Sequence, residues 1–273
     1  MVAILNKKKL SDDIYEIMID APNVSENAKP GQFFMLQATP EAERVALSIS
    51  DWDAEKKTVT FVIMKVGESS GAIVEKNVGE EYYHVCGPLG NPSDLCDMTD
   101  AELSNEKVVF LAGGVGAAPV YPQAKFLHEK GFTPTVILAA RNESLILYEE
   151  KLRSVADVHI ATDDGSRGFH GLVTDALQDL VDKGMKFTRA VAIGPMIMMK
   201  FAVIKAEALG ITSVVSLNPI MLDGTGMCGC CRCKVGGETK YACVDGPEFF
   251  GKDVDFDEAL RRLRRWWKIE KNI

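Results

Sequence analysis

The sequence lacks an uninterrupted apolar run of the roughly 20 residues that a transmembrane helix needs. Its most apolar stretches, residues 108–120 and 190–204, are broken by glycine, proline or lysine. It also lacks an excess of basic residues, because 31 lysines and arginines face 39 aspartates and glutamates and give a net charge of −8. A general nucleic-acid binder needs a basic face to neutralise phosphates. We therefore expect neither a membrane span nor a nucleic-acid partner.

The N-terminus lacks the order of a secretory signal, in which charge precedes the apolar core. Here apolar residues 1–5 precede Lys7, Lys8 and Lys9. We therefore expect a cytoplasmic chain, whose thiols stay reduced. Five of its seven cysteines fall between Cys228 and Cys243. Clustered thiols in a reducing compartment indicate metal binding rather than disulfides.

The first hundred residues are typical of short strands. With 273 residues, of which 47% are hydrophobic and 26% charged, the chain is globular and long enough for about two domains. Turn signals such as Pro30-Gly31 and Asp51-Trp52-Asp53 separate segments rich in β-branched and aromatic residues. These segments span residues 14–19, 32–37 and 58–63. Their spacing predicts a small antiparallel β barrel over residues 1–103.

A different pattern runs from about residue 105 to residue 217. Lys107–Ala112 is a continuous apolar stretch after its first residue, as in a strand that is buried on both faces. Further strands are predicted at residues 135–140, 158–161, 190–193 and 213–217, and helices at residues 121–130, 147–155, 173–183 and 197–209. Strands that alternate with helices predict a doubly wound, mostly parallel α/β domain over residues 104–217.

Two short segments follow the α/β pattern. Residues 218–251 are rich in glycine and cysteine and too irregular to form a hydrophobic core of their own. Residues 252–273 contain a predicted basic helix that either contacts a partner protein or packs on its own domain, since Trp and Arg are favoured interface anchors. Its basic and tryptophan residues are Arg261, Arg262, Arg264, Arg265, Trp266, Trp267, Lys268 and Lys271.

The cysteine segment carries the strongest chemical signal. Thiolates bind soft metals and iron–sulfur clusters, and the Cys228-x2-Cys231 spacing lets two sulfurs meet at one metal. The surrounding glycines permit backbone N–H groups to converge, which suits an anionic iron–sulfur cluster. The alternative is a structural zinc site formed by Cys228, Cys231, Cys233 and Cys243.

Glycine-rich turns form the second signal. Gly113–Pro119 follows a buried strand and precedes a helix, so it favours phosphate binding at the helix N-terminus, although tight turns use glycine in any case. Pro119 suits the first turn of a helix. Residues 67–71 and 86–90 either hold phosphate or are plain turns.

Taken together, these features resemble the ferredoxin–NADP reductase superfamily. The order of a flavin barrel, Gly-x-Gly-x-x-Pro at residues 114–119 and a late Gly194-Pro195-Met196 matches that family. The cysteine loop is similar to that of the electron-transfer subunit branch of this superfamily. That branch includes the iron–sulfur flavoprotein subunit of dihydroorotate dehydrogenase B and the small subunit of NADH-dependent ferredoxin–NADP oxidoreductase. The strings at residues 223–228 and 242–249 look like the second of these.

The resemblance implies FAD, a [2Fe–2S] cluster and NAD(H) as substrate, with NAD against NADP left open. The implied flavin residues are Val45, Leu47 and Ser48, with Leu47 in place of the family's stacking tyrosine, and Gly67, Ser69 and Ser70 in a phosphate loop. The implied nucleotide residues are Gly114, Gly116, Asp163, Gly194, Pro195 and Met196. The implied cluster ligands are Asp223, Cys228, Cys231 and Cys243. Asp223 stands where the dihydroorotate branch has cysteine, and Cys233 is the alternative to Asp223 as the fourth cluster ligand.

The implied function is that of an oxidoreductase subunit without a general acid or base. A flavin joins a two-electron hydride donor to a one-electron iron–sulfur acceptor. We expect electrons to pass from NADH through FAD and the cluster to a larger iron–sulfur flavoprotein partner in a heterodimer or larger complex that reduces ferredoxin, as in the electron-bifurcating NADH-dependent ferredoxin–NADP oxidoreductase. The alternatives are the dihydroorotate dehydrogenase B subunit and a zinc-stabilised nucleotide-binding module without redox activity.

Overall fold

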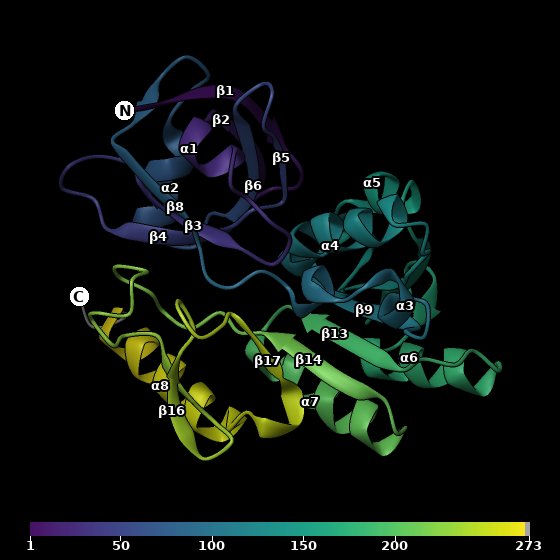
Figure 1. Ribbon diagram of the computed structural model, residues 1–273. Helices are drawn as coiled ribbons and strands as arrows, with labels where there is room; N and C mark the ends of the chain where they lie inside the picture. The colour runs from purple at the N-terminus through teal and green to yellow at the C-terminus, as the bar shows by residue number, and fades with distance from the viewer. Residues whose placement is uncertain (271–273) are drawn as a thin grey trace.

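Two antiparallel sheets form the N-terminal barrel (Figure 1). The computed structural model describes the backbone of residues 1–270 and the side chains of residues 1–264. One sheet has the order β5-β6-β2-β1-β7 and the other has the order β4-β3-β8. The elements are β1 (Val2–Lys9), β2 (Ile14–Asp20), α1 (Pro22–Ser25), β3 (Phe33–Gln37), β4 (Arg44–Ser48), β5 (Asp51–Asp53), β6 (Thr58–Met64), α2 (Glu68–Glu75), β7 (Glu81–Tyr82) and β8 (His84–Leu89).

Strand β3 serves two cores because its side chains alternate between the two faces of the sheet. Phe34 and Leu36 are buried inside the barrel. Phe33 and Met35 point the other way and belong to a second core that is shared with the α/β domain and the cysteine region. This strand therefore joins the barrel to the rest of the chain.

The α/β domain is built on a sheet of order β12-β11-β10-β9-β13-β14-β17. All neighbouring strands are parallel except the pair β14 and β17. The linker to this domain holds η1 (Asp94–Asp97) and α3 (Asp100–Leu103), and the domain itself comprises β9 (Val108–Gly113), η2 (Gly114–Gly116), α4 (Ala117–Glu129), β10 (Thr135–Ala140), η3 (Glu143–Leu145), α5 (Glu149–Arg153), β11 (Asp157–Thr162), β12 (Phe169–His170), α6 (Val173–Asp182), β13 (Arg189–Ile193), α7 (Met196–Ala208) and β14 (Thr212–Ser216). The predicted fold class, a β barrel followed by a doubly wound α/β domain, is confirmed.

The C-terminal segment returns to the α/β sheet after a small hairpin. It comprises β15 (Arg232–Val235), β16 (Glu238–Tyr241), β17 (Glu248–Phe250), η4 (Gly251–Asp253) and α8 (Phe256–Glu270). The predicted C-terminal helix is present, and it packs against α7 and β15 (Figure 1). The side chains of Arg265, Trp266, Trp267 and Lys268, and all of residues 271–273, lie outside the described part.

Two local expectations need correction. The turn expected at Asp51–Asp53 is strand β5, because these residues pair with Thr58–Thr60. The turn follows directly, where the Asp53 Oδ1 accepts a 2.9 Å hydrogen bond from the Lys56 N–H. Helix α4 starts at Ala117 rather than Tyr121, since Pro119 lies in the first turn, where no helical N–H is required.

Polar contacts hold the barrel against the α/β domain. The Lys151 Nζ lies 2.7 Å from the Glu16 Oε2, and the Tyr148 hydroxyl contacts the same carboxylate. That hydroxyl is also 3.2 Å from the Ser50 Oγ. Within residues 1–270, no helix is both long and apolar enough to cross a membrane.

Candidate functional site

Asp223 closes the cysteine loop, residues 223–231, on itself. Its Oδ1 accepts a 2.7 Å hydrogen bond from the Thr225 N–H, and its Oδ2 accepts one of 2.8 Å from the Cys228 N–H. These backbone donors, Thr225 first, hold the pKa of the Asp223 carboxyl below its usual value. Gly224 and Gly226 have φ values of +77° and +84°, which a side chain would oppose. The loop therefore presents an ionised carboxylate beside the Cys228 thiol.

Cys231 and Cys243 form the buried half of the site. Their sulfurs lie 3.2 Å apart, and both residues are buried, whereas Cys228 is exposed. Burial is the main reason that the pKa of Cys243 rises to about 12. Two backbone amides donate to sulfur, from Gly226 to Cys243 and from Cys230 to Cys228 at 3.5 Å. Paired thiols with N–H donors on their sulfurs fit an anionic iron–sulfur cluster better than zinc.

Cys233 has a different environment. It is buried on β15, and its sulfur lies 3.6 Å from the carbonyl oxygen of Lys240 in the same hairpin. Burial raises the pKa of its thiol to about 12. Asp223 and Cys228 are thus brought together, as are Cys231 and Cys243. Within the described residues, no three His, Cys, Asp or Glu side chains are gathered closely enough to hold a metal ion. The assignment of Asp223 over Cys233 therefore stays a prediction.

The predicted glycines lie where the strand order of the α/β sheet reverses, between β9 and β13. A Cβ at Gly116 would lie 2.2 Å from the Ile193 carbonyl oxygen, and one at Gly194 would lie 3.1 Å from the Gly113 Cα. Gly114 has φ +56° with open space around it. Ligands of doubly wound sheets bind at such a switch point, where backbone N–H groups meet phosphate.

The remaining predicted nucleotide residues lie at the same edge of the sheet. Asp163 follows β11, is exposed and donates its N–H to the Ala140 carbonyl oxygen at 3.0 Å. Pro195 is exposed at the start of α7, whereas Met196 is buried and belongs to the shared core. Met196 can therefore support the edge through its backbone but not through an open side chain.

Strand β4 divides the predicted flavin residues between its two faces. Leu47 is only 6% exposed and packs inside the barrel together with Val45. Ser48 pairs with Phe33 and is exposed on the opposite face, which is turned toward the other domains. Ser48 is therefore the β4 side chain that a flavin on this outer face could meet.

Helix α2 begins at the predicted phosphate loop. Gly67 is its N-cap residue, and the Ser70 Oγ accepts the N–H groups of Val66 and Gly67 at 2.9 and 3.0 Å. Ser70 thus shapes the turn. Ser69 is directed to the start of β4, where its Oγ donates to the Glu43 Oε2 at 3.1 Å. The loop and β4 lie together, so one ligand can reach both.

Sequence reasoning missed a buried polar junction at Glu248. Its Oε1 accepts a 2.6 Å hydrogen bond from the Gln123 Nε2, which joins β17 to α4, and Ser93 of the linker donates to Gln123 at 3.3 Å. The Glu248 Oε2 is enclosed and has no partner among the described residues. Burial, helped by the charge of Asp94, raises the pKa of Glu248 to about 7.

We expect Glu248→Gln to remove a pH dependence of stability. Because the folded pKa is raised from 4.5 to about 7, the folded state holds the proton more tightly, so stability falls as pH rises between these values. The glutamine variant should be more stable than the wild type at pH 8, by on the order of 1–3 kcal/mol, and equally stable near pH 4.5. Urea unfolding across pH 4.5–8 measures this difference. Parallel curves for the two proteins would contradict the assignment.

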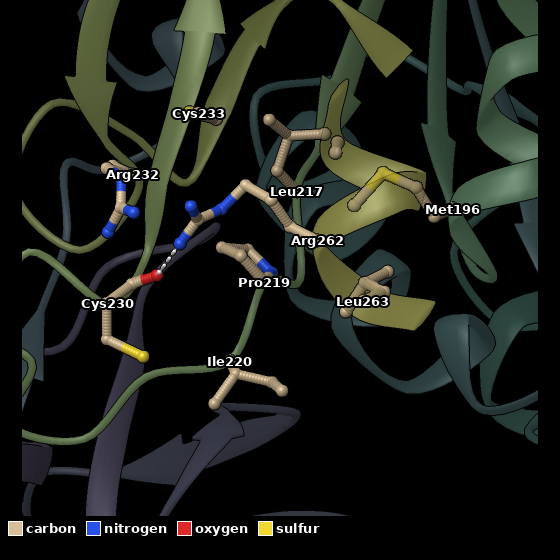
Figure 2. A pocket seen from close by; sticks show the side chains of 10 residues that line it. Met196, Leu217, Pro219, Ile220, Cys230, Arg232, Cys233, Arg262 and Leu263 are labelled. Carbon is tan, nitrogen blue, oxygen red and sulfur yellow. Dashed lines mark hydrogen bonds between the residues drawn. The ribbon is translucent and has the colours of Figure 1, made fainter. Parts of the chain in front are cut away.

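A small pocket of about 20 Å³ separates the cysteine loop from helix α8 (Figure 2). Its lining includes Leu217, Pro219 and Ile220 before the loop, together with Cys230, Cys233, Arg262 and Leu263. Figure 2 shows the Arg262 guanidinium reaching across to the Cys230 carbonyl oxygen.

Comparison with known proteins agrees with this geometry. Residues 218–255 match the iron–sulfur cluster binding domain of dihydroorotate dehydrogenase B. A dihydroorotate dehydrogenase B electron-transfer subunit homolog of Thermotoga maritima is 42% identical over 98% of this chain and 92% of its own. The dihydroorotate dehydrogenase B electron-transfer subunit from Geobacillus sp. is 32% identical over 93% of this chain and 97% of its own. The chain belongs to this family of electron-transfer subunits.

Solved structures of the family extend the match. A chain from the NADH-dependent reduced ferredoxin–NADP oxidoreductase structure, studied for flavin-based electron bifurcation, superposes with a TM-score of 0.92. It is 41% identical, and the match covers 99% of the present chain and 95% of that chain. The predicted resemblance is thereby confirmed. The predicted cofactors, FAD and a [2Fe–2S] cluster, agree with these relatives.

Proposed function

We propose that this electron-transfer subunit takes electrons from NADH and passes them through its cysteine loop to a larger partner subunit that reduces ferredoxin. The main support is structural, because the cysteine loop contacts the barrel and the α/β domain at the same time. The Gly224 backbone is so close to β3 and β8 that a Cβ would lie 2.7 Å from Leu89 and 2.9 Å from Met35. Strand β17, which follows the loop, pairs with β14.

The chain's own residues bind and orient the cofactors rather than move protons. The Gly114–Gly116 turn and Gly194 offer a close-packed backbone edge for the nucleotide, and the α2 N-terminus with Ser48 offers a flavin face. Asp223, Cys228, Cys231 and Cys243 would hold the cluster. When bound, the flavin exchanges two electrons with NADH and single electrons with an iron–sulfur centre. The η2 turn contacts β6 of the barrel, so nucleotide and flavin sites adjoin.

The surface around the cysteine loop supports a partner at that site. Leu222, Met227 and Val244 are 43%, 89% and 42% exposed, and each is the direct neighbour of a predicted ligand. Exposed apolar residues beside one site favour an interaction surface there. A partner that covers them would exclude water from the cluster and receive its electrons over a short distance.

Asp223 favours the ferredoxin–NADP oxidoreductase type over the dihydroorotate dehydrogenase type, because the dihydroorotate branch is expected to carry cysteine there. Sequence identity does not separate the two types. It is 41% to the chain of the ferredoxin–NADP oxidoreductase structure and 42% to the dihydroorotate dehydrogenase B electron-transfer subunit homolog of Thermotoga maritima. The dihydroorotate role is the second candidate function.

Anaerobic purification with the co-expressed larger subunit tests the proposal. We expect near-stoichiometric FAD, iron and acid-labile sulfide on this chain, bleaching of the visible spectrum by NADH, and NADH-dependent ferredoxin reduction by the complex. Orotate formation from dihydroorotate would support the second candidate instead. A colourless protein that contains zinc but neither flavin nor iron would refute both.

A further inference from the structure

Arg262 ties helix α8 to the cysteine loop through one backbone carbonyl. Its Nη2 donates a 3.0 Å hydrogen bond to the carbonyl oxygen of Cys230, although the two residues are 32 positions apart (Figure 2). Cys230 is not a predicted ligand, but it lies directly before Cys231 and two residues after Cys228. The contact therefore acts on the backbone between two predicted ligands.

The backbone of Cys230 makes two contacts of different kinds. Its N–H donates to the Cys228 sulfur at 3.5 Å, and its carbonyl oxygen accepts from Arg262 at 3.0 Å. An N–H group stays directed at a ligand sulfur only while the dihedral angles of its residue are held. The guanidinium restrains the carbonyl group of the same residue, so it helps to keep that donor in place.

Helix α8 is fixed firmly enough to act as the support. Its N-terminal residue Phe256 and Ala259 are buried in the shared core. The preceding Asp255 donates its N–H to the Lys234 carbonyl oxygen on β15 at 2.9 Å. Because β15 follows the cysteine loop without a break, the fold sets the distance between Arg262 and the loop.

The surroundings of the guanidinium make its charge effective. Arg262 is half-buried and borders the pocket of about 20 Å³, whose lining is mainly apolar. A charge in such surroundings is screened less than one in open water. Arginine suits this place better than lysine, because its planar fork is pre-organised for a directed hydrogen bond.

We infer that Arg262 is a positioning residue for the iron–sulfur loop, which holds the Cys230 backbone in place and sets a positive charge beside an anionic cluster. The inference rests on the proposed function, since it assumes that the loop carries the cluster. Groups that hydrogen-bond around a metal site typically change metal affinity by about 10–100-fold when they are removed. Loss of Arg262 should therefore loosen the cluster rather than abolish its assembly.

Arg232, the first residue of β15, offers a matched control beside the same loop. Its Nη1 donates to the Gly229 carbonyl oxygen at 3.0 Å, the same length as the Arg262 contact. Arg232 is exposed, and its acceptor is only three residues away. Its bond runs from the first residue of β15 back to the adjoining loop and does not reach helix α8.

The experiment compares Arg262→Met, Arg262→Lys and Arg232→Met in the full-length protein, purified anaerobically. Methionine keeps much of the side-chain volume and loses the charge and the donors. Iron loss to bathophenanthroline disulfonate should be about tenfold faster in Arg262→Met than in the wild type, intermediate in Arg262→Lys and unchanged in Arg232→Met. The EPR spectrum of the dithionite-reduced cluster should change in Arg262→Met only.

Wild-type iron-loss rates and an unchanged EPR spectrum in Arg262→Met would overturn the inference while leaving the proposed function intact. If Arg262→Met does not fold, as judged by circular dichroism and FAD content, Arg262→Gln replaces it. A folded glutamine variant that loses iron at the wild-type rate would likewise overturn it. A wild-type protein without a [2Fe–2S] signal would overturn the proposed function and this inference with it.

Discussion

Replacement of Cys231 or Cys243 by serine is expected to remove the iron–sulfur cluster. These two sulfurs already lie 3.2 Å apart in buried positions, and a serine hydroxyl is a much poorer ligand for iron than a thiolate. Bound iron should fall at least about tenfold, since even residues that only support metal ligands cost this much. FAD content should stay near that of the wild type, because the barrel core contains neither cysteine. Iron, sulfide and flavin analysis of anaerobic protein measures both outcomes.

The same series decides between the two candidates for the fourth ligand. Asp223→Ala should lose the cluster because it removes the carboxylate that closes the loop on the Cys228 N–H. Cys233→Ser should keep the cluster, since that thiol contacts the Lys240 carbonyl of its own hairpin. Loss of iron in Cys233→Ser with full retention in Asp223→Ala would show that the assignment is wrong.

Gly116→Ala should weaken NADH binding and lower stability together. The added Cβ would lie 2.2 Å from the Ile193 carbonyl oxygen, so the η2 turn and the end of β13 must separate. Overpacking of this kind costs about 1–3 kcal/mol. The φ of Gly116 is −61°, which an alanine adopts without strain, so the whole effect comes from the contact. We expect the KM for NADH to rise at least about tenfold, the equivalent of 1.4 kcal/mol.

Gly131→Ala is the control for the general cost of losing a glycine. Gly131 has φ +86°, nothing lies within 4 Å of its Cβ position, and it follows the far end of α4. This variant should lose some thermal stability with an unchanged KM for NADH. If Gly116→Ala shows the wild-type KM in folded protein, the turn does not form part of the nucleotide site.

The α/β domain was largely predictable because its central strands β9, β10, β13 and β14 are mostly buried on both faces. The predicted strand at residues 135–140 has the same bounds as β10, and the other predicted strands shift by one residue or so. The two-residue strand β12, which has no buried residue, was not predicted. The barrel gave weaker signals. Strand β1 ends in three lysines at a partly exposed position, and β7 has only two residues, so neither shows a clear alternation. Their pairing depends on partners that are distant in the sequence.

The site shows the same division between local and distant causes. The spacing of the cysteines and the glycine content predicted a metal site in the cysteine loop, because most of the candidate ligands lie close together in the sequence. Which side chains of β4 face the barrel core could be assigned only from the strand register. This register places Leu47 opposite Phe34 inside the barrel. Glu248 and Arg262 carried no local signal. Each acquires its partner, Gln123 or Cys230, only when segments 125 and 32 residues apart meet in the fold.

Strand β17 limits how this region could be transplanted. It forms the antiparallel edge of the seven-stranded sheet, and the chain on either side packs against α7 and β3. A cut after residue 217 would leave β14 with an open edge and strip the cover from an apolar seam. Conversely, a cysteine loop grafted onto another reductase would need a recipient sheet with a free edge strand. The cysteine region is thus an integral part of the sheet and the shared core, and not a separable module.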